Sequence, residues 1–138
     1  MKDYVACGQH PIDCAKYVKP DADKALAAAA ALAKQAQQQG KGDGSAHNNI
    51  FDAIRHAFWN ALMTRDIGAD EAKGFADAHE DPSTFQEQLE TCQDMANNAI
   101  GREIGSHFAK TATDAQVLDA VIGAAASGQL IAAPYQCF

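Results

Sequence analysis

Apolar residues return at the spacing of an α-helix in the middle of this chain, and this spacing constrains the fold most strongly. Phe51, Ile54, Phe58 and Leu62 follow one another at i, i+3, i+7 and i+11, which places them on one face of a helix. The only segment with a weak strand signal is 129–133. The sequence therefore predicts an all-α fold.

Start and stop signals divide the chain into a compact bundle of five or six helices. Alanine is the best helix former, so the alanine-rich segment after Pro20 is expected to be helical, and Pro20 is expected to end the helix before it. Gly68 is expected to close the central helix. Two capping-box pairs mark helix starts: Ser83 with Gln86, and Thr113 with Gln116. The predicted helices span 11–18, 21–39, 48–66, 70–80, 84–108 and 114–127.

Length and charge narrow the class of protein. A chain of 138 residues suggests one domain, 1–138, with the segment 48–108 at its centre. The net charge is 11 − 18 = −7, which argues against a nucleic-acid partner, because such binders need clustered Lys and Arg. The sequence contains no run of 18 apolar residues, so no membrane-spanning helix is predicted. The opening "MKDYVACGQHPIDC" lacks the apolar core of a signal peptide, so none is expected.

Four cysteines lie mainly toward the two ends of the chain. Their even number predicts two disulfides, with free thiols in a cytosolic protein as the alternative, and four cysteines allow three connectivities. A local bridge across the turn at Pro11 is favoured, and the other would attach the C-terminal tail to the helix 84–108. The favoured pairs are Cys7–Cys14 and Cys92–Cys137.

Two polar stripes accompany the apolar faces of the helices at 48–66 and 84–108. Side chains four residues apart share a helix face, and the stripes have this spacing: Asp52, His56 and Asn60 on the first helix, Asp94, Asn98 and Arg102 on the second. Such stripes can face each other across a cleft and share hydrogen bonds. The alternative is a pair of solvated faces, with Asp52 serving the helix N-terminus.

His79 and Glu80 are expected to close one end of that cleft. His79 shares a helix face with Ala72 and Phe75, so it is predicted to point inward, where a histidine needs a hydrogen-bond partner or a ligand. A satisfied core histidine is the alternative. The adjacent carboxylate favours a functional role, since His and Glu together supply a base, an acid or metal ligands.

The second stripe lies on a predicted helix that contains residues of low helix propensity. Asn97 and Asn98 adjoin inside the predicted helix, and Gly101 and Gly105 each cost about 1 kcal/mol relative to alanine. A close neighbouring helix or a ligand explains their presence. The alternative is a glycine-lined crossing with two exposed asparagines.

These features predict one site with defined roles. We expect four side chains to converge in one pocket as catalytic groups: His56, His79, Glu80 and Asp94. Substrate binding is expected from six others: Arg55, Trp59, Asn60, Asn97, Asn98 and Arg102. A divalent cation, if one is bound, would use His56, His79 and Asp94.

Three segments resemble a family of small bacterial domains found at the C-terminal tips of polymorphic-toxin and Rhs-repeat proteins. They are "DAIRHAFWNALMT", "AKGFADAHE" and "DMANNAIGREIG", and they match the pattern R-H-x-x-W-N, H-E and D-x-x-N-N-x-x-G-R. The resemblance covers about 7–106. It implies an antibacterial effector with a carrier or secretion protein, a cognate immunity protein, and delivery to the target-cell periplasm.

Three classes of function are consistent with these features. The first is a hydrolase that acts on the cell envelope, with a phospholipid, a lipid-linked wall precursor or peptidoglycan as substrate. "RHAFWN" and "CQDMANN" loosely resemble the paired helices of secreted phospholipases A2, although Ala57 stands where those enzymes carry an aspartate. The second is a non-catalytic module that binds a partner or perturbs membranes. The third, and the least favoured, is a nuclease.

Overall fold

The computed structural model describes residues 7–80 and 85–133 and confirms the all-α prediction over that part of the chain. The helical elements are α2 (Pro11–Asp13), the π-helical turn η1 (Cys14–Val18), α3 (Lys19–Gln38), α4 (Ile50–Ile67), α5 (Ala69–His79), α6 (Phe85–Ser106) and α7 (Asp114–Ala126). No described residue belongs to a strand, including 129–133.

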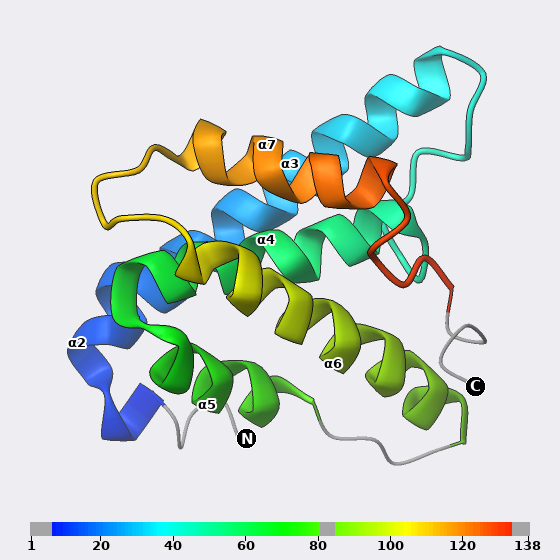
Figure 1. The fold of residues 1–138 in the computed structure, drawn as a ribbon. Coiled ribbons are helices and arrows are strands. Elements are labelled where there is room, and N and C mark those ends of the chain that lie inside the picture. The colour runs from blue at the N-terminus through cyan, green and yellow to red at the C-terminus, as the bar shows by residue number, and fades with distance from the viewer. Residues whose placement is uncertain (1–6, 81–84, 134–138) are drawn as a thin grey trace.

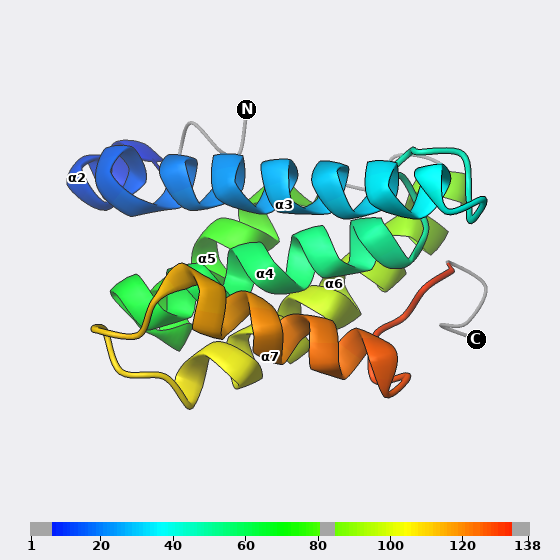
Figure 2. The same cartoon turned by 90° about the horizontal axis from the view of Figure 1, so that it is seen from above.

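Helix α4 lies at the centre, with the other long helices around it (Figures 1 and 2). It contacts α3, α5, α6 and α7. Of the fourteen consecutive positions from Asp52 to Arg65 in α4, the thirteen other than the half-buried Arg55 are buried. A helix enclosed on all sides has no solvated face, so its polar side chains must find partners inside the protein.

Capping residues define the ends of two helices, and Gly68 and the Thr113–Gln116 pair lie where the sequence predicted them. Asn49 caps α4 by accepting hydrogen bonds from two backbone N–H groups of the first turn, and Gly68 ends it at a φ of 88° that favours glycine. Thr113 and Gln116 form the predicted capping box of α7. The other predicted box begins at Ser83, which lies outside the described residues.

The prediction that Pro20 ends a helix is wrong. The chain stays helical from Pro11 to Gln38, and Pro20 occupies the first turn of α3. The π-helical turn directly before it carries the bond from the Lys19 N–H to the Cys14 carbonyl, five residues back. This wider turn accommodates the proline ring. It also spares the helix a hydrogen bond that proline, which has no backbone N–H, could not donate.

A disulfide joins Cys7 to Cys14 and confirms the predicted local bridge. Cys92 is also disulfide-bonded. Its predicted partner, Cys137, lies outside the described residues.

Candidate functional site

Helix α4 places its whole polar stripe inside the protein. Asp52, His56 and Asn60 are 2%, 4% and 0% exposed, so the solvated-face interpretation is wrong for this helix. Asn98, which faces them from α6, is 1% exposed. Buried polar groups at this density require a shared hydrogen-bond network.

The network exists because α6 crosses α4 at very short range. A Cβ atom added to Gly101 would lie 2.2 Å from the Ala57 carbonyl oxygen, and one added to Gly105 would lie 2.4 Å from that of Ala61. Glycine on one helix and alanine on the other thus bring the two backbones together. The glycine-lined crossing foreseen from the sequence is present, but the neighbouring asparagines are buried rather than exposed.

A chain of three side chains fixes the tautomer of His56. Arg102 donates to Asn60 Oδ1 at 3.0 Å, while Asn60 Nδ2 donates to the His56 carbonyl at 2.9 Å and to Asn98 Oδ1 at 2.8 Å. The Asn98 oxygen therefore faces His56, whose Nδ1 lies 3.2 Å away. Since that oxygen only accepts, Nδ1 carries the proton and Nε2 keeps its lone pair.

Acidic and basic groups surround His56 Nε2. Asp94 Oδ1 lies 3.2 Å away, Asp52 Oδ1 3.6 Å, and the Arg55 guanidinium 3.2 Å. Asp52 is already held, because Arg55 donates twice to its Oδ1 and the Asn48 N–H donates to its Oδ2. Asp94 Oδ1 is buried and has no hydrogen-bond donor of its own, whereas Nε2 already faces the Arg55 guanidinium, which can only donate. A proton shared with Nε2 would give Asp94 its missing partner.

The environment lowers the pKa of His56 and raises that of Asp94. Burial, together with Arg55 and His79, lowers the pKa of His56 to about 4 although Asp52 opposes the shift. Burial, followed by Glu80 and Asp52, raises the pKa of Asp94 to about 8. At neutral pH the imidazole is therefore neutral and the Asp94 carboxyl keeps its proton, which it can donate to Nε2.

Glu80 also belongs to this cluster. It follows the last residue of α5, and its half-buried carboxyl group lies beside Asn98 and near Asp94. Burial raises the pKa of Glu80, while His79, Asn98 and Arg55 act in the opposite direction. Of the four groups predicted to converge in one pocket, Asp94 contacts His56 and lies near Glu80, whereas only His56 and His79 line the apolar pocket.

The predicted burial of His79 is wrong, because this side chain is exposed. It is the last residue of α5, beyond the buried face made by Ala72, Phe75 and Ala76, and no further turn of that helix covers it. Its ring nevertheless stands edge-on to Trp59, with the ring centroids 5.6 Å apart. His79 therefore lies at the rim of the site.

An apolar pocket of about 260 Å³ opens beside His56. Its lining combines α4 and α5 with the N-terminal helical segment: Cys7, Cys14, Val18, Lys19, Ala22, Ala25, Arg55, His56, Trp59, Phe75 and His79. No sequence motif indicated the contribution of the N-terminal segment. The Trp59 indole N–H donates to the Val18 carbonyl at 3.2 Å, and this hydrogen bond helps to join the N-terminal segment to α4.

The six predicted binding residues divide into three groups. Arg55 and Trp59 line the pocket. Three others position His56: Asn60, Asn98 and Arg102. Asn97 lies outside the site, because its amide exchanges two hydrogen bonds, of 2.8 and 2.9 Å, with the backbone of Ile131.

A cation could be held by Asp52, His56 and Asp94, whose donor atoms lie within 4.8 Å of one another. This set differs from the predicted one, since Asp52 takes the place of His79. Arg55 binds the same Asp52 oxygen and lies 3.2 Å from Nε2, and its charge would repel a divalent ion. The geometry therefore favours a proton over a metal between His56 and Asp94.

The fold and site define a small all-α domain with a buried histidine–carboxylate centre at the end of an apolar pocket. The chain belongs to the family described as a domain of unknown function (DUF6973), which matches residues 5–129. Comparisons with curated proteins and with solved structures gave no match. Within the described residues, no helix is both long and apolar enough to cross a membrane.

Proposed function

We propose that this protein is a hydrolase that cleaves an ester bond in a lipid of the bacterial envelope. One observation supports the proposal above the others: the pocket beside His56 is apolar and ends at a buried imidazole whose tautomer is fixed. Acyl chains require an apolar pocket, and ester hydrolysis requires a base positioned beside it.

The size and charge of the pocket favour a lipid over a wall polymer. A volume of about 260 Å³ lies just below the range typical of small-molecule sites, about 300–1,000 Å³, so it suits part of one acyl chain better than a glycan strand. Lys19 and Arg55 are the cationic residues of the lining. Both can attract a phosphate-bearing headgroup.

In the proposed reaction His56 is the general base. Its Nε2 takes a proton from a water molecule as the water oxygen attacks the ester carbonyl carbon, and Asp52 and Asp94 stabilise the imidazolium. The tetrahedral intermediate then collapses, the bond to the alcohol oxygen breaks, and that oxygen takes the proton back. The products are a fatty acid and an alcohol.

Asp94 controls when Nε2 is available. While Asp94 is protonated, its O–H competes with the Arg55 guanidinium for the Nε2 lone pair. Because the pKa of Asp94 is raised to about 8, activity should increase as the pH rises through that value. Asp52, Glu80 and Glu90 increase this pKa and Arg55 decreases it, so all four belong to the same pH response.

The decisive experiment uses Asp94→Asn and measures fatty-acid release from phosphatidylethanolamine–phosphatidylglycerol vesicles. The asparagine amide donates permanently to Nε2, so the fold should remain while the rate falls by about 10²-fold or more. Asp70→Asn, at an exposed position of α5, is the matched control and should retain the parent rate.

A non-catalytic role is the competing proposal, because buried amide networks also fix the register of packed helices. It predicts that vesicle hydrolysis is absent from the parent protein, or that a folded Asp94→Asn protein hydrolyses lipid at the parent rate. Either result would reject the hydrolase.

The proposed biological role is that of an antibacterial effector. It rests on the resemblance to toxin tips and on the Cys7–Cys14 bridge, because disulfides persist in oxidising compartments. A carrier protein and a cognate immunity protein are the partners that this role requires. The protein should arrest growth when exported to the periplasm and not when retained in the cytoplasm, whereas equal growth of both cultures would contradict the role.

A further inference from the structure

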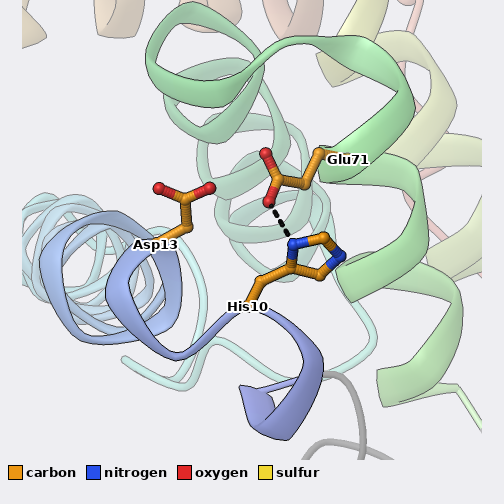
Figure 3. Close-up of side chains that lie close together, drawn as sticks. All are labelled: His10, Asp13 and Glu71. Atoms are coloured by element: carbon orange, nitrogen blue, oxygen red, sulfur yellow. Dashed lines mark ion pairs between the residues drawn. The ribbon is translucent and has the colours of Figure 1, made fainter.

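A second group of potential ligands lies on the surface, separate from the residues around His56. It consists of His10, Asp13 and Glu71 (Figure 3), whose ligand atoms all lie within 4.8 Å of one another. His10 directly precedes the short helix α2, Asp13 is the last residue of that helix, and Glu71 comes from the first turn of α5. Two segments far apart in the sequence thus present one nitrogen and two carboxylate groups to the same space.

The spacing of these atoms fits a small metal ion. His10 Nδ1 lies 3.1 Å from Glu71 Oε1. For a tetrahedral zinc ion with bonds of about 2.0–2.1 Å, neighbouring ligand atoms are about 3.3 Å apart. His10 and Asp13 are three residues apart around a helical turn, which places both on the side that faces α5. Rotamer adjustments alone can therefore close the three ligands around an ion.

The chemistry of the set narrows the choice of ion. An imidazole nitrogen with two carboxylate oxygens suits zinc and the other late first-row divalent metals. Calcium and magnesium prefer sites built from oxygen alone. Three protein ligands also leave one coordination position for water, as in zinc sites that are open to solvent.

His10 is already held in place for this role. Its ring stands edge-on to Phe75 of α5, with centroids 5.9 Å apart, and the disulfide from Cys7 to Cys14 spans the segment that carries His10 and Asp13. Preorganised ligands lose less conformational entropy when an ion binds.

We propose that His10, Asp13 and Glu71 form a zinc site that fastens the N-terminal helical segment to α5. The two segments it joins also supply opposite parts of the apolar pocket, since Cys7 and Cys14 line it from one and Phe75 from the other. The ion would thereby hold the pocket wall together. This site does not depend on the proposed hydrolysis.

Isothermal titration calorimetry of the tag-free, oxidised protein with zinc chloride tests the site. Reductant is omitted, because free thiolates would bind zinc. We expect one zinc per chain, at least tenfold weaker binding in both His10→Ala and Glu71→Gln, and a higher melting temperature for the parent with zinc. Calcium and magnesium chloride should bind at least tenfold more weakly than zinc.

Two control variants locate the ion. His107→Ala removes another exposed histidine and should leave zinc binding within twofold of the parent. Asp94→Asn alters the buried cluster and should also leave it unchanged. The proposal fails if the parent does not bind zinc, if Glu71→Gln binds it as the parent does while circular dichroism shows an intact fold, or if Asp94→Asn abolishes binding.

Discussion

The close crossing of α4 and α6 gives the most quantitative prediction, through the substitution Gly101→Ala. The added Cβ would lie 2.2 Å from the Ala57 carbonyl oxygen, whereas ordinary contacts begin at 3.4 Å. The helices must therefore separate by 3.4 − 2.2, or about 1.2 Å. Overpacking of this kind costs about 3 kcal/mol when only backbone can move, and the better helix propensity of alanine returns about 1 kcal/mol. We expect a net loss of about 2 kcal/mol in the free energy of unfolding.

Urea denaturation followed by circular dichroism measures this loss against a matched control. Gly123→Ala lies on the exposed side of α7 and would meet no atom within 4 Å, so it should gain up to about 1 kcal/mol. Opposite signs for the two glycines are the expected result. If Gly101→Ala stabilised the protein as much as Gly123→Ala, the close packing inferred for α4 and α6 would be refuted.

Three further predictions concern stability. Burial and the neighbouring Asp66 carboxyl raise the pKa of Asp21 to about 8. Because the folded state then holds a proton that the unfolded state releases near pH 4, the free energy of unfolding should fall as the pH rises from about 4 to about 8. Urea titrations across this range should show a shallower fall for Asp21→Asn. Asn97→Ala removes both hydrogen bonds to Ile131 and should lower the free energy of unfolding by about 1–3 kcal/mol. The segment after α7 should also be cleaved faster by a protease, and an unchanged cleavage rate would show that Asn97 does not hold that segment in place. Thr113→Ala removes the capping box of α7 and should lower the free energy of unfolding by about 1 kcal/mol in the same assay.

Local signals in the sequence predicted most of the helices. Asn49, Gly68 and Thr113 act through their immediate neighbours, so their effect on helix ends can be read without the tertiary structure. The prediction for Pro20 was wrong because the π-helical turn before it accommodates the proline inside a continuous helix. Nothing in the local sequence pattern distinguishes that turn from a helix end.

The site was predictable in part, because the spacing of His56 and Asn98 along their helices reveals two polar stripes. The partner of each side chain depends on tertiary contacts, which spacing does not encode. Asn97 and Asn98 adjoin in the sequence, yet one binds the Ile131 backbone and the other fixes the His56 ring. The carboxyl pair of Asp21 and Asp66 joins α3 to α4, and no motif marks it.

The π-helical turn at Cys14–Val18 lets the chain carry one residue more than an unbroken α-helix would need between the disulfide-closed segment and α3. One residue corresponds to about 100° around an α-helix, so an extra residue without such a turn would rotate His10 away from Glu71. The wider turn absorbs that residue, and His10 and Cys14 keep the facing that the ion pair and the pocket wall require. Deleting one residue from 15–17 would therefore leave the N-terminal segment nearly in phase with α5. It would also return the ring of Pro20 to a regular helical turn, where that ring clashes with the carbonyl four residues before it.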